Sequence, residues 1–230
     1  MSQDKIIALL PMKAHSERVP NKNIRAFNGK PLYFWMMESL LQSEFVKEVI
    51  INTDIKGIEK EVKDIFKNVR VIDRPENLCG DYVSVNALIA HDMGQPDGEY
   101  FLQTHSTNPL LTTATINKAI QQYFGSIEKY DSLFGVTRLK KRFYWSDGRA
   151  INHDPKDQLL RTQDLQPVYE ENSCIYIFSR ESFRSAHNHR IGLRPQMFEI
   201  DHIEAVDIDE ESDFILAETL HKLRYDKSKK

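Results

Sequence analysis

The stretch around which this chain is organised reads Pro11-Met-Lys-Ala-His-Ser-Glu-Arg-Val-Pro-Asn-Lys-Asn23. It follows the apolar run Ile6-Ile-Ala-Leu-Leu10, which predicts a buried strand. A turn at Gly29-Lys-Pro31 and a helical pattern from Leu32 to Gln42 come after it. Within ten residues the stretch carries three cationic side chains, Lys13, Arg18 and Lys22. The order of elements is therefore strand, cationic irregular loop, helix.

This order has two interpretations. Open α/β sheets hold a phosphate or nucleotide in such a loop, at the carboxyl edge of the first strand, where fixed positive charge offsets anionic oxygens. A solvated basic loop is the alternative, and the loop taken alone favours neither. It is not a Walker A loop or a G-x-G-x-x-G fingerprint, because its nearest glycine, Gly29, lies beyond it.

The composition is that of an ordinary globular domain. Of the 230 residues, 40% are hydrophobic and 28% are charged, so we expect a single α/β domain over residues 1–230. The net charge of −3 gives no reason to expect nucleic acid or an anionic membrane as a partner. No apolar run reaches the roughly 20 residues that span a bilayer, and the first residues lack the layout of a signal peptide. We expect a cytoplasmic protein that binds neither nucleic acid nor membrane.

The two cysteines, Cys79 and Cys174, are far apart and form no C-x-x-C pattern. This spacing predicts neither a disulfide framework nor a zinc site. Reduced thiols in a cytoplasmic protein are the simplest account.

Along the chain, apolar runs of about five residues alternate with longer amphipathic stretches, a pattern typical of a mostly parallel sheet. Asp54 and either Thr112 or Thr113 are candidate helix caps, and Ser179 is expected to start a short helix. Further strands are predicted at 46–52, 69–72, 99–103, 131–137, 172–178 and 197–200. Longer helices are predicted at 55–66, 83–91, 113–124 and 210–223.

Residues 138–170 differ from the rest of the chain. Their apolar runs are short, and aromatic and turn-forming residues are frequent, as in Arg142-Phe-Tyr-Trp145 and Asp147-Gly148. This pattern predicts a β-rich excursion, a segment inserted between strands of the main sheet. Tyr, Trp and Arg are favoured at interfaces, so a subunit contact is one interpretation. A surface hairpin with a few aromatic contacts is the other.

Asp207-Ile-Asp209 is the second informative element. On an extended segment residues i and i+2 project to one face, so both carboxylates can address one point. Such a pair suits Mg²⁺, which is commonly held by one or two carboxylates and substrate phosphate oxygens. Capping of the following helix by Asp209 is the alternative. Together with the cationic loop, the pair suggests a site for a metal–nucleotide complex.

The sequence resembles the acylneuraminate cytidylyltransferases (CMP-sialic acid synthetases), and the related CMP-Kdo synthetases have a similar opening. The resemblance covers most of the chain in order. It rests on these segments: Pro11-Met-Lys-x-x-Ser-x-Arg-Val-Pro-x-Lys-Asn23, Gly29-Lys-Pro-Leu32, Asn52-Thr-Asp54, Arg74-Pro75, Leu78-Cys-Gly-Asp81, Ser84, Leu102-Gln103, Arg161 with Pro167, Tyr169 and Asn172, Ile175-Tyr-Ile177 and Asp207-Ile-Asp209.

The resemblance implies a Rossmann-like, three-layer nucleotidyltransferase sheet with a dimerisation excursion, and therefore a homodimer. It implies Mg²⁺-dependent transfer of CMP from CTP to the anomeric hydroxyl of an acidic 2-keto-3-deoxy sugar, with release of pyrophosphate. The implied phosphate ligands are Lys13 and Lys22, and Asn23 would lie beside the nucleotide. Arg74 and Ser84 match positions that bind ribose and cytosine. Gln103, Arg161, Tyr169 and Asn172 match the sugar site, with Arg161 on the sugar carboxylate, and Asp207 and Asp209 match the magnesium pair.

Charge considerations agree with these roles. Attack by an acidic sugar on a tetra-anionic nucleotide brings two anions together, so Lys13, Arg18, Lys22 and Mg²⁺ would offset their repulsion and stabilise the charge that develops on pyrophosphate. We expect metal held by Asp209 to lower the pKa of the anomeric hydroxyl. No cysteine nucleophile is needed, and direct in-line displacement is expected.

Two departures from the family pattern keep other functions open. Ala14-His15 replaces the usual glycine pair, and Glu17 replaces the usual lysine. The segment Thr104-His-Ser-Thr-Asn-Pro109 is two residues longer than its counterpart. The alternatives are another nonulosonate, an eight-carbon ulosonate, another sugar or nucleotide, or a catalytically inactive nucleotide-binding protein.

Overall fold

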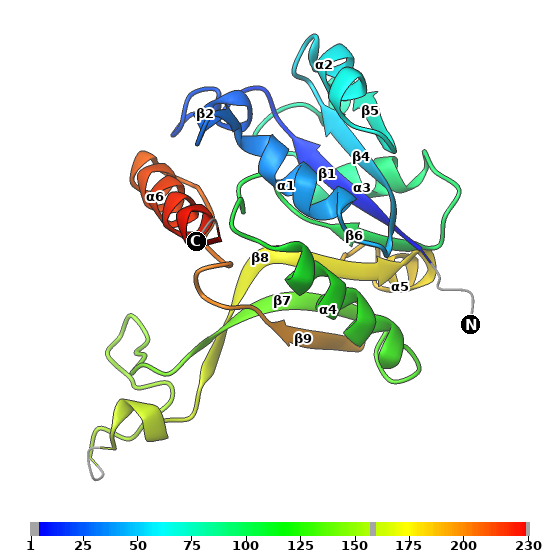
Figure 1. The fold of residues 1–230 in the computed structure, drawn as a ribbon. Helices are drawn as coiled ribbons and strands as arrows, with labels where there is room; N and C mark the ends of the chain where they lie inside the picture. The colour runs from blue at the N-terminus through cyan, green and yellow to red at the C-terminus, as the bar shows by residue number, and fades with distance from the viewer. Residues whose placement is uncertain (1–4, 157–159, 229–230) are drawn as a thin grey trace.

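The protein is built on a seven-stranded sheet with helices on both faces (Figure 1). The computed structural model describes residues 5–156 and 160–228. In spatial order the strands are β5 (Val69–Asp73), β4 (Val46–Thr53), β1 (Ile6–Met12), β6 (Tyr100–Gln103), β8 (Val168–Ser179), β7 (Ser132–Leu139) and β9 (Pro195–Glu199). The helices are α1 (Leu32–Leu41), α2 (Ile58–Ile65), α3 (Val85–Met93), α4 (Thr113–Gly125), α5 (Arg180–Ser185) and α6 (Glu211–Ser228). A small second sheet pairs β2 (Ala26–Phe27) with β3 (Lys30–Pro31).

The predicted mostly parallel sheet is confirmed. β1 pairs in parallel with β4 and β6, β4 with β5, and β7 with β9. Only β8 runs against its neighbours, because it is antiparallel to both β6 and β7. The carboxyl ends of β1, β4 and β6 therefore meet at one edge of the sheet, where ligands bind in folds of this kind.

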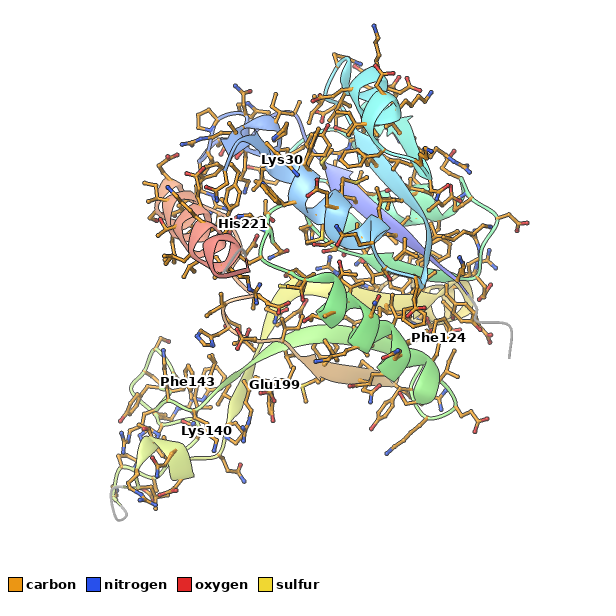
Figure 2. The ribbon with its side chains drawn as sticks, viewed as in Figure 1. Lys30, Phe124, Lys140, Phe143, Glu199 and His221 are labelled. Carbon is orange, nitrogen blue, oxygen red and sulfur yellow. The ribbon has the colours of Figure 1, made fainter. Side chains whose placement is uncertain are left out.

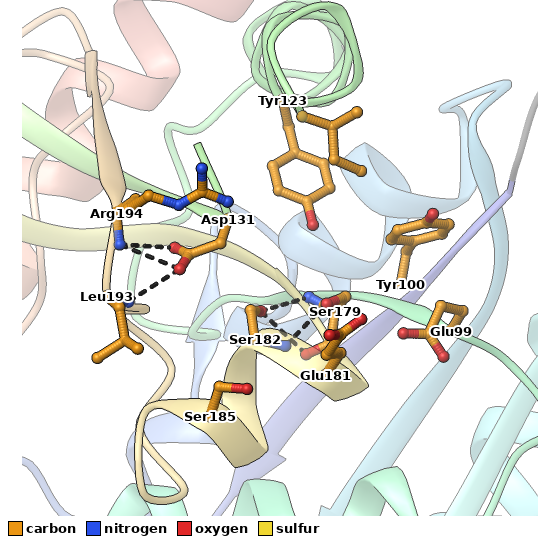
Figure 3. A pocket seen from close by; sticks show the side chains of 11 residues that line it. Glu99, Tyr100, Tyr123, Asp131, Ser179, Glu181, Ser182, Ser185, Leu193 and Arg194 are labelled. Carbon is orange, nitrogen blue, oxygen red and sulfur yellow. Dashed lines mark hydrogen bonds between the residues drawn. The ribbon is translucent and has the colours of Figure 1, made fainter. Parts of the chain in front are cut away.

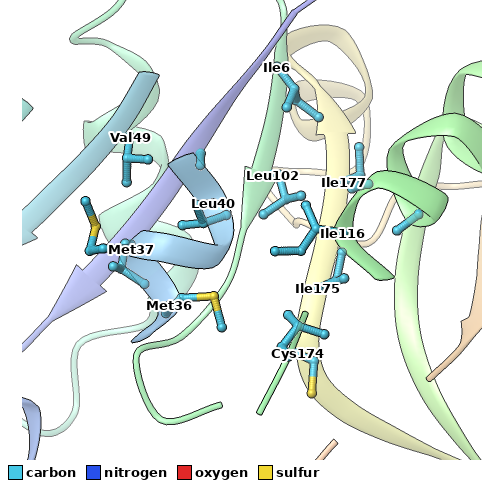
Figure 4. Close-up of a cluster of buried hydrophobic side chains, with 14 of the residues drawn as sticks. Ile6, Met36, Met37, Leu40, Val49, Leu102, Ile116, Cys174, Ile175 and Ile177 are labelled. Carbon is cyan, nitrogen blue, oxygen red and sulfur yellow. The ribbon is translucent and has the colours of Figure 1, made fainter. Parts of the chain in front are cut away.

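Strand β1 shows why the fold has three layers. Side chains of a strand alternate between faces, and in β1 both faces are buried. Ile6 and Leu10 join a cluster that includes side chains of α1, α2 and α4, whereas Ile7 joins a second cluster with side chains of α3 and α5. Figure 4 shows part of the first cluster, in which Met36 of α1 and Ile116 of α4 face the sheet. A continuous apolar run is therefore the correct signature for this strand.

Two expected caps are confirmed and one is wrong. Thr112 accepts a hydrogen bond from the backbone N–H of Thr115, and Ser179 forms a capping box with Ser182. The cap position of α2 is Gly57 (φ 79°) and not Asp54. Asp54 Oδ1 instead accepts the N–H of Ala14 at 2.6 Å, because the loops after the parallel strands β1 and β4 leave the sheet side by side.

Strands β7 and β8 extend beyond the main sheet as an antiparallel ribbon, and the predicted excursion projects from its end (Figure 1). Lys140 and Phe143 lie in this projection (Figure 2). Among the described residues between the two strands, regular structure is limited to one bridge between Tyr144 and Ala150 and the 3₁₀ turn η3 (Thr162–Asp164). The β structure of the excursion is thus mostly the ribbon itself.

Helix α6 is fixed beside the small sheet and the start of α1. Phe214 packs edge-on against Phe27, with ring centroids 5.5 Å apart. Arg25 donates two hydrogen bonds to the carboxylate of Glu211, at 2.6 and 2.7 Å. This attachment brings residues 207–209, just before α6, to the loop that follows β1.

Candidate functional site

A pocket of about 440 Å³ opens at the carboxyl edge of β1, β4 and β6. Six of the residues singled out in the sequence line it: Lys13, Lys22, Asn23, Arg74, Asp207 and Asp209. The cationic loop and the paired carboxylates, about 190 residues apart in the sequence, thus share one cavity.

Hydrogen bonds hold the loop in place. Lys22 Nζ donates to the carbonyl oxygen of Ile208 at 2.5 Å and lies 3.8 Å from Asp209 Oδ1. Asn23 is buried, donates to the carbonyl oxygen of Lys13 at 2.7 Å and accepts from the hydroxyl of Ser106. Asn23 therefore fixes the backbone of the loop that carries the cations.

The loop cations have carboxylate partners. Lys13 Nζ lies 2.6 Å from Asp81 Oδ1, and Arg18 Nη2 lies 2.9 Å from Asp209 Oδ1. Burial lowers the pKa of Lys22, the least exposed of the three. A polyanion entering the pocket would compete with Asp81 and Asp209 for these cations.

Asp207 has the features of a metal ligand. Its Oδ1 atom is buried and has no hydrogen-bond partner among the described residues. Burial is the main cause that raises the pKa of Asp207, and the charge of Asp209 adds to it. No group of three or more His, Cys, Asp or Glu that could hold a metal occurs in the described part of the chain. A two-carboxylate site fits Mg²⁺, whose remaining ligands are water and phosphate oxygens.

Arg74 is held rigidly at the pocket wall. Its Nε donates to Asn52 Oδ1 at 2.8 Å, and its Nη2 donates to the carbonyl oxygens of Met12 and Asn52 at 2.8 and 3.0 Å. Asn52 in turn donates to the buried carboxylate of Asp92, whose pKa is raised by burial. Asp92 thus helps to position Arg74 through the side chain of Asn52.

Arg190 and His105 also line the pocket, although the sequence analysis gave neither of them a role in the site. Arg190 follows α5, in a turn, and donates from Nη1 to Gln103 Oε1 at 2.6 Å. His105 also lines the pocket, and burial lowers its pKa to about 4, so the imidazole is neutral at pH 7. No sequence pattern marks Arg190, because its neighbours His187-Asn-His189 suggest only a weak metal motif.

The other predicted residues lie outside the pocket lining. Ser84 caps α3 by accepting from the N–H of Asn86, and its neighbours Val83 and Val85 line the pocket. Gln103 is fully buried behind the wall and reaches the pocket through Arg190. Arg18 reaches the pocket through Asp209.

Three residues that the family pattern assigns to the sugar are also outside the lining of this pocket. Arg161 lies in the excursion, 74% exposed, with Nε 2.7 Å from Asp164 Oδ2. Tyr169 is exposed on the ribbon. Asn172 is buried in β8, donates to Thr137 Oγ1 and accepts from the N–H of Cys174. Their roles stay predictions.

A second hollow of about 610 Å³ lies at the opposite, amino edge of the parallel strands (Figure 3). Its polar groups maintain local structure. Asp131 accepts the backbone N–H groups of Leu193 and Arg194 at 3.0 Å, and Ser179 and Ser182 form the capping box of α5. The chemistry-bearing residues lie at the other edge.

Comparisons with known proteins agree with this architecture. A family model described as cytidylyltransferase matches residues 7–230. The chain is 27% identical to the N-acylneuraminate cytidylyltransferase of Escherichia coli O18:K1:H7, covering 95% of this chain and 52% of that protein. It therefore spans about half the length of that relative. It is 27% identical to a pseudaminic acid cytidylyltransferase of Campylobacter jejuni, covering 75% and 77%. It is 26% identical to the CMP-N,N'-diacetyllegionaminic acid synthase of Legionella pneumophila, covering 95% and 97%.

Solved structures share the fold. A CMP:2-keto-3-deoxy-manno-octonic acid synthetase in complex with CTP superposes with a TM-score of 0.70 at 14% identity, covering 96% of this chain and all of that one. A 4-diphosphocytidyl-2C-methyl-D-erythritol synthase from Anaerococcus prevotii gives 0.65 at 11% identity, covering 95% and 96%. Within the described residues, no helix is long and apolar enough to cross a membrane.

Proposed function

The chain belongs to the cytidylyltransferase family, and we propose that it transfers CMP from CTP to the anomeric hydroxyl of a nonulosonic acid and releases pyrophosphate. The observation that carries this proposal is the contact between the cationic loop after β1 and the segment with the two carboxylates, Asp207 and Asp209. Lys22 and Arg18 of the first loop bind Ile208 and Asp209 at 2.5 and 2.9 Å, so cations for a triphosphate and carboxylates for a metal address one cavity.

The loop cations would bind the triphosphate. Lys13, Arg18 and Lys22 would leave their carboxylate partners for phosphate oxygens and neutralise the charge that grows on the departing pyrophosphate. Asn23 keeps the loop backbone in place during this exchange, since both ends of its amide are engaged. Arg74, fixed by Asn52, would hold the nucleoside, as its position in the family pattern implies.

Asp207 and Asp209 would hold Mg²⁺. When bound there, the metal would supply Lewis acidity to the phosphate oxygens and lower the pKa of the attacking hydroxyl. The two carboxylates would fix the position of the metal. The bond from Lys22 to Ile208 holds the segment with both carboxylates beside the loop that would bind the phosphates. Neither thiol suits a nucleophile: Cys174 is fully buried with a raised pKa, and Cys79 is outside the pocket lining.

The departures in the loop do not fill the pocket. Glu17 is exposed and outside the lining, so its carboxylate is no part of the pocket wall. This arrangement favours an active enzyme over an inactive nucleotide-binding protein. The named relatives act on N-acylneuraminate, pseudaminic acid and N,N'-diacetyllegionaminic acid, and these acids define the substrate class that we propose. We further propose that the enzyme is a cytoplasmic homodimer built through residues 138–170.

The test is pyrophosphate release from CTP and Mg²⁺ with N-acetylneuraminate, pseudaminate, N,N'-diacetyllegionaminate and 2-keto-3-deoxy-manno-octonate. We expect release with at least one nine-carbon acid, and its loss in Asp209→Asn. Release only with 2-keto-3-deoxy-manno-octonate would show that the substrate is an eight-carbon ulosonate and not a nonulosonic acid. No release from folded protein that binds CTP would support the inactive alternative. Thermal shifts with CTP, UTP, GTP and ATP test the base, because a ligand that binds only the folded state raises its stability.

A further inference from the structure

Arg190 is a mostly buried cation in the pocket wall, and none of the described carboxylates lies within hydrogen-bond distance of it. Its side chain is 18% exposed, and its guanidinium carbon lies 3.6 Å from the centroid of the Tyr176 ring. Nη1 donates to Gln103 Oε1 at 2.6 Å. Among the described residues its one ion pair is with Glu171, and that distance is 3.9 Å.

Glu171 is a weak counter-ion for this charge. Its carboxylate accepts a hydrogen bond from the Tyr176 hydroxyl, and its side chain is 44% exposed. Removing a cation from water is unfavourable unless a hydrogen-bonded anion replaces the lost hydration. Burial accordingly lowers the pKa of Arg190, although a guanidinium stays charged at neutral pH. The site therefore holds positive charge that an incoming anion can neutralise.

The other cations of the pocket are engaged differently. Lys13 and Arg18 have carboxylate partners within 3 Å, and Nε and Nη2 of Arg74 donate to Asn52 and Met12. Arg190 comes from a separate segment after α5, and the charges of both Arg190 and Lys22 act on the His105 imidazole. Because His105 is neutral at pH 7, it adds no positive charge to this part of the pocket, and Arg190 supplies that charge.

We propose that Arg190 binds the carboxylate of the acceptor sugar acid and thereby selects acids over neutral sugars, an inference that rests on the proposed function. Its planar fork can meet a carboxylate with two parallel hydrogen bonds. Gln103 and the face of Tyr176 fix the orientation of the fork before the ligand arrives. Arg190 takes the part that the family pattern gives to Arg161, which in this chain is exposed and bound to Asp164.

Binding can be measured without turnover, by isothermal titration of the protein saturated with CMP and Mg²⁺, since CMP has no pyrophosphate to release. The probes are the four acids named above and their methyl esters, which keep the sugar and lose the charge. We expect wild-type protein to bind at least one acid about 30-fold or more tightly than its ester, the effect of losing one side of a buried charge pair. Arg190→Gln should bind that acid and its ester alike, and Arg190→Lys should fall between.

Arg180→Gln is the matched control. Arg180 is also partly buried, donates to the carbonyl oxygens of Gly98 and Pro96, and lies over the Phe101 ring, but it is outside the pocket lining. We expect its loss to lower the melting temperature and to leave the preference for acid over ester unchanged. Unchanged CMP binding in Arg190→Gln and Arg190→Lys shows that both variants are folded.

Two results would overturn the inference: wild-type protein that binds none of the acids more tightly than its ester, or an Arg190→Gln variant that keeps the full preference. Loss of the preference in Arg161→Gln with retention in Arg190→Gln would return the role to Arg161 and equally overturn it. Failure of the proposed function has a different signature, in which Arg190-dependent acid binding persists while wild-type protein releases no pyrophosphate from CTP.

Discussion

Lys22 Nζ donates a hydrogen bond to the carbonyl oxygen of Ile208, joining two residues 186 positions apart in the chain. This bond attaches the cationic loop after β1 to the segment that carries both site carboxylates. Lys22 is therefore both a cation of the pocket and a structural tie across it.

If CMP transfer proceeds as proposed, replacing Lys22 by Met should lower kcat/KM for pyrophosphate release by about 100-fold or more, because it removes the preorganised charge assigned to the departing pyrophosphate. Lys30→Met is the control, because Lys30 (labelled in Figure 2) pairs with Glu38 at 2.6 Å and is not among the residues that line the pocket. Its loss should change kcat/KM less than about twofold, as for most surface pairs. Equal effects of the two substitutions would remove Lys22 from catalysis.

Asp207 gives a prediction about pH. Its raised pKa means that the folded protein binds the proton more tightly than the unfolded chain, so ionised Asp207 destabilises the fold. This cost is absent below the unfolded value of about 3.8 and complete above the folded pKa, so the contribution of Asp207 to stability falls as pH rises through that window. Without metal, Asp207→Asn should therefore gain melting temperature relative to wild type between pH 4 and pH 7.5.

The same variant should lose the Mg²⁺-dependent part of the stabilisation by CTP and lose turnover. Asp201→Asn, at an exposed carboxylate outside the pocket, should match wild type in both measurements. An Asp207→Asn enzyme with full Mg²⁺-dependent activity would show that Asp207 is not a metal ligand.

Ser84→Ala separates a capping role from nucleotide binding. Ser84 caps α3 and Thr112 caps α4, so either alanine substitution should lower the unfolding free energy by about 1 kcal/mol. Only Ser84→Ala should also raise the KM for CTP, as its position beside the pocket lining and in the family pattern predicts. An unchanged KM would make Ser84 a cap alone.

Gly135 tests the packing behind the site. A Cβ there would lie 2.6 Å from Asn172 Oδ1 and 2.8 Å from Ile200 Cδ1, so Gly135→Ala should lower the unfolding free energy by about 1–3 kcal/mol. At Gly125, in the last turn of α4, a Cβ would meet nothing within 4 Å, and Gly125→Ala should be neutral or stabilising. Urea unfolding of both variants checks the difference, and similar midpoints would contradict the packing argument.

The excursion predicts a dimer. Trp145 and Tyr144 are 58% and 53% exposed on it, and such side chains are favoured at interfaces. Sedimentation velocity at micromolar concentration should show a dimer that Trp145→Asp dissociates, whereas Leu216→Asp, at an exposed position of α6, should leave the dimer intact. A monomeric wild-type protein would refute the dimer.

The sequence by itself determined the mostly parallel α/β fold and most of the charged residues of the pocket. Apolar runs and helical patterns are local signals, and strand order places the loop with Lys13 and Lys22 at the carboxyl edge of the sheet. The Asp207–Asp209 pair was joined to that loop by the chemistry of a metal–nucleotide complex, and Arg74 by the family resemblance; all five residues line one pocket.

Only the tertiary structure decided the partners of these groups. Arg190 reaches the pocket through a turn after α5, and its environment comes from β6 and β8, which no local pattern encodes. Asn172 lies in β8 near the register shift at Gly135, and its amide bonds to Thr137 and to the N–H of Cys174. Such assignments depend on desolvation and on contacts between distant segments, and these quantities exist only once the chain has packed.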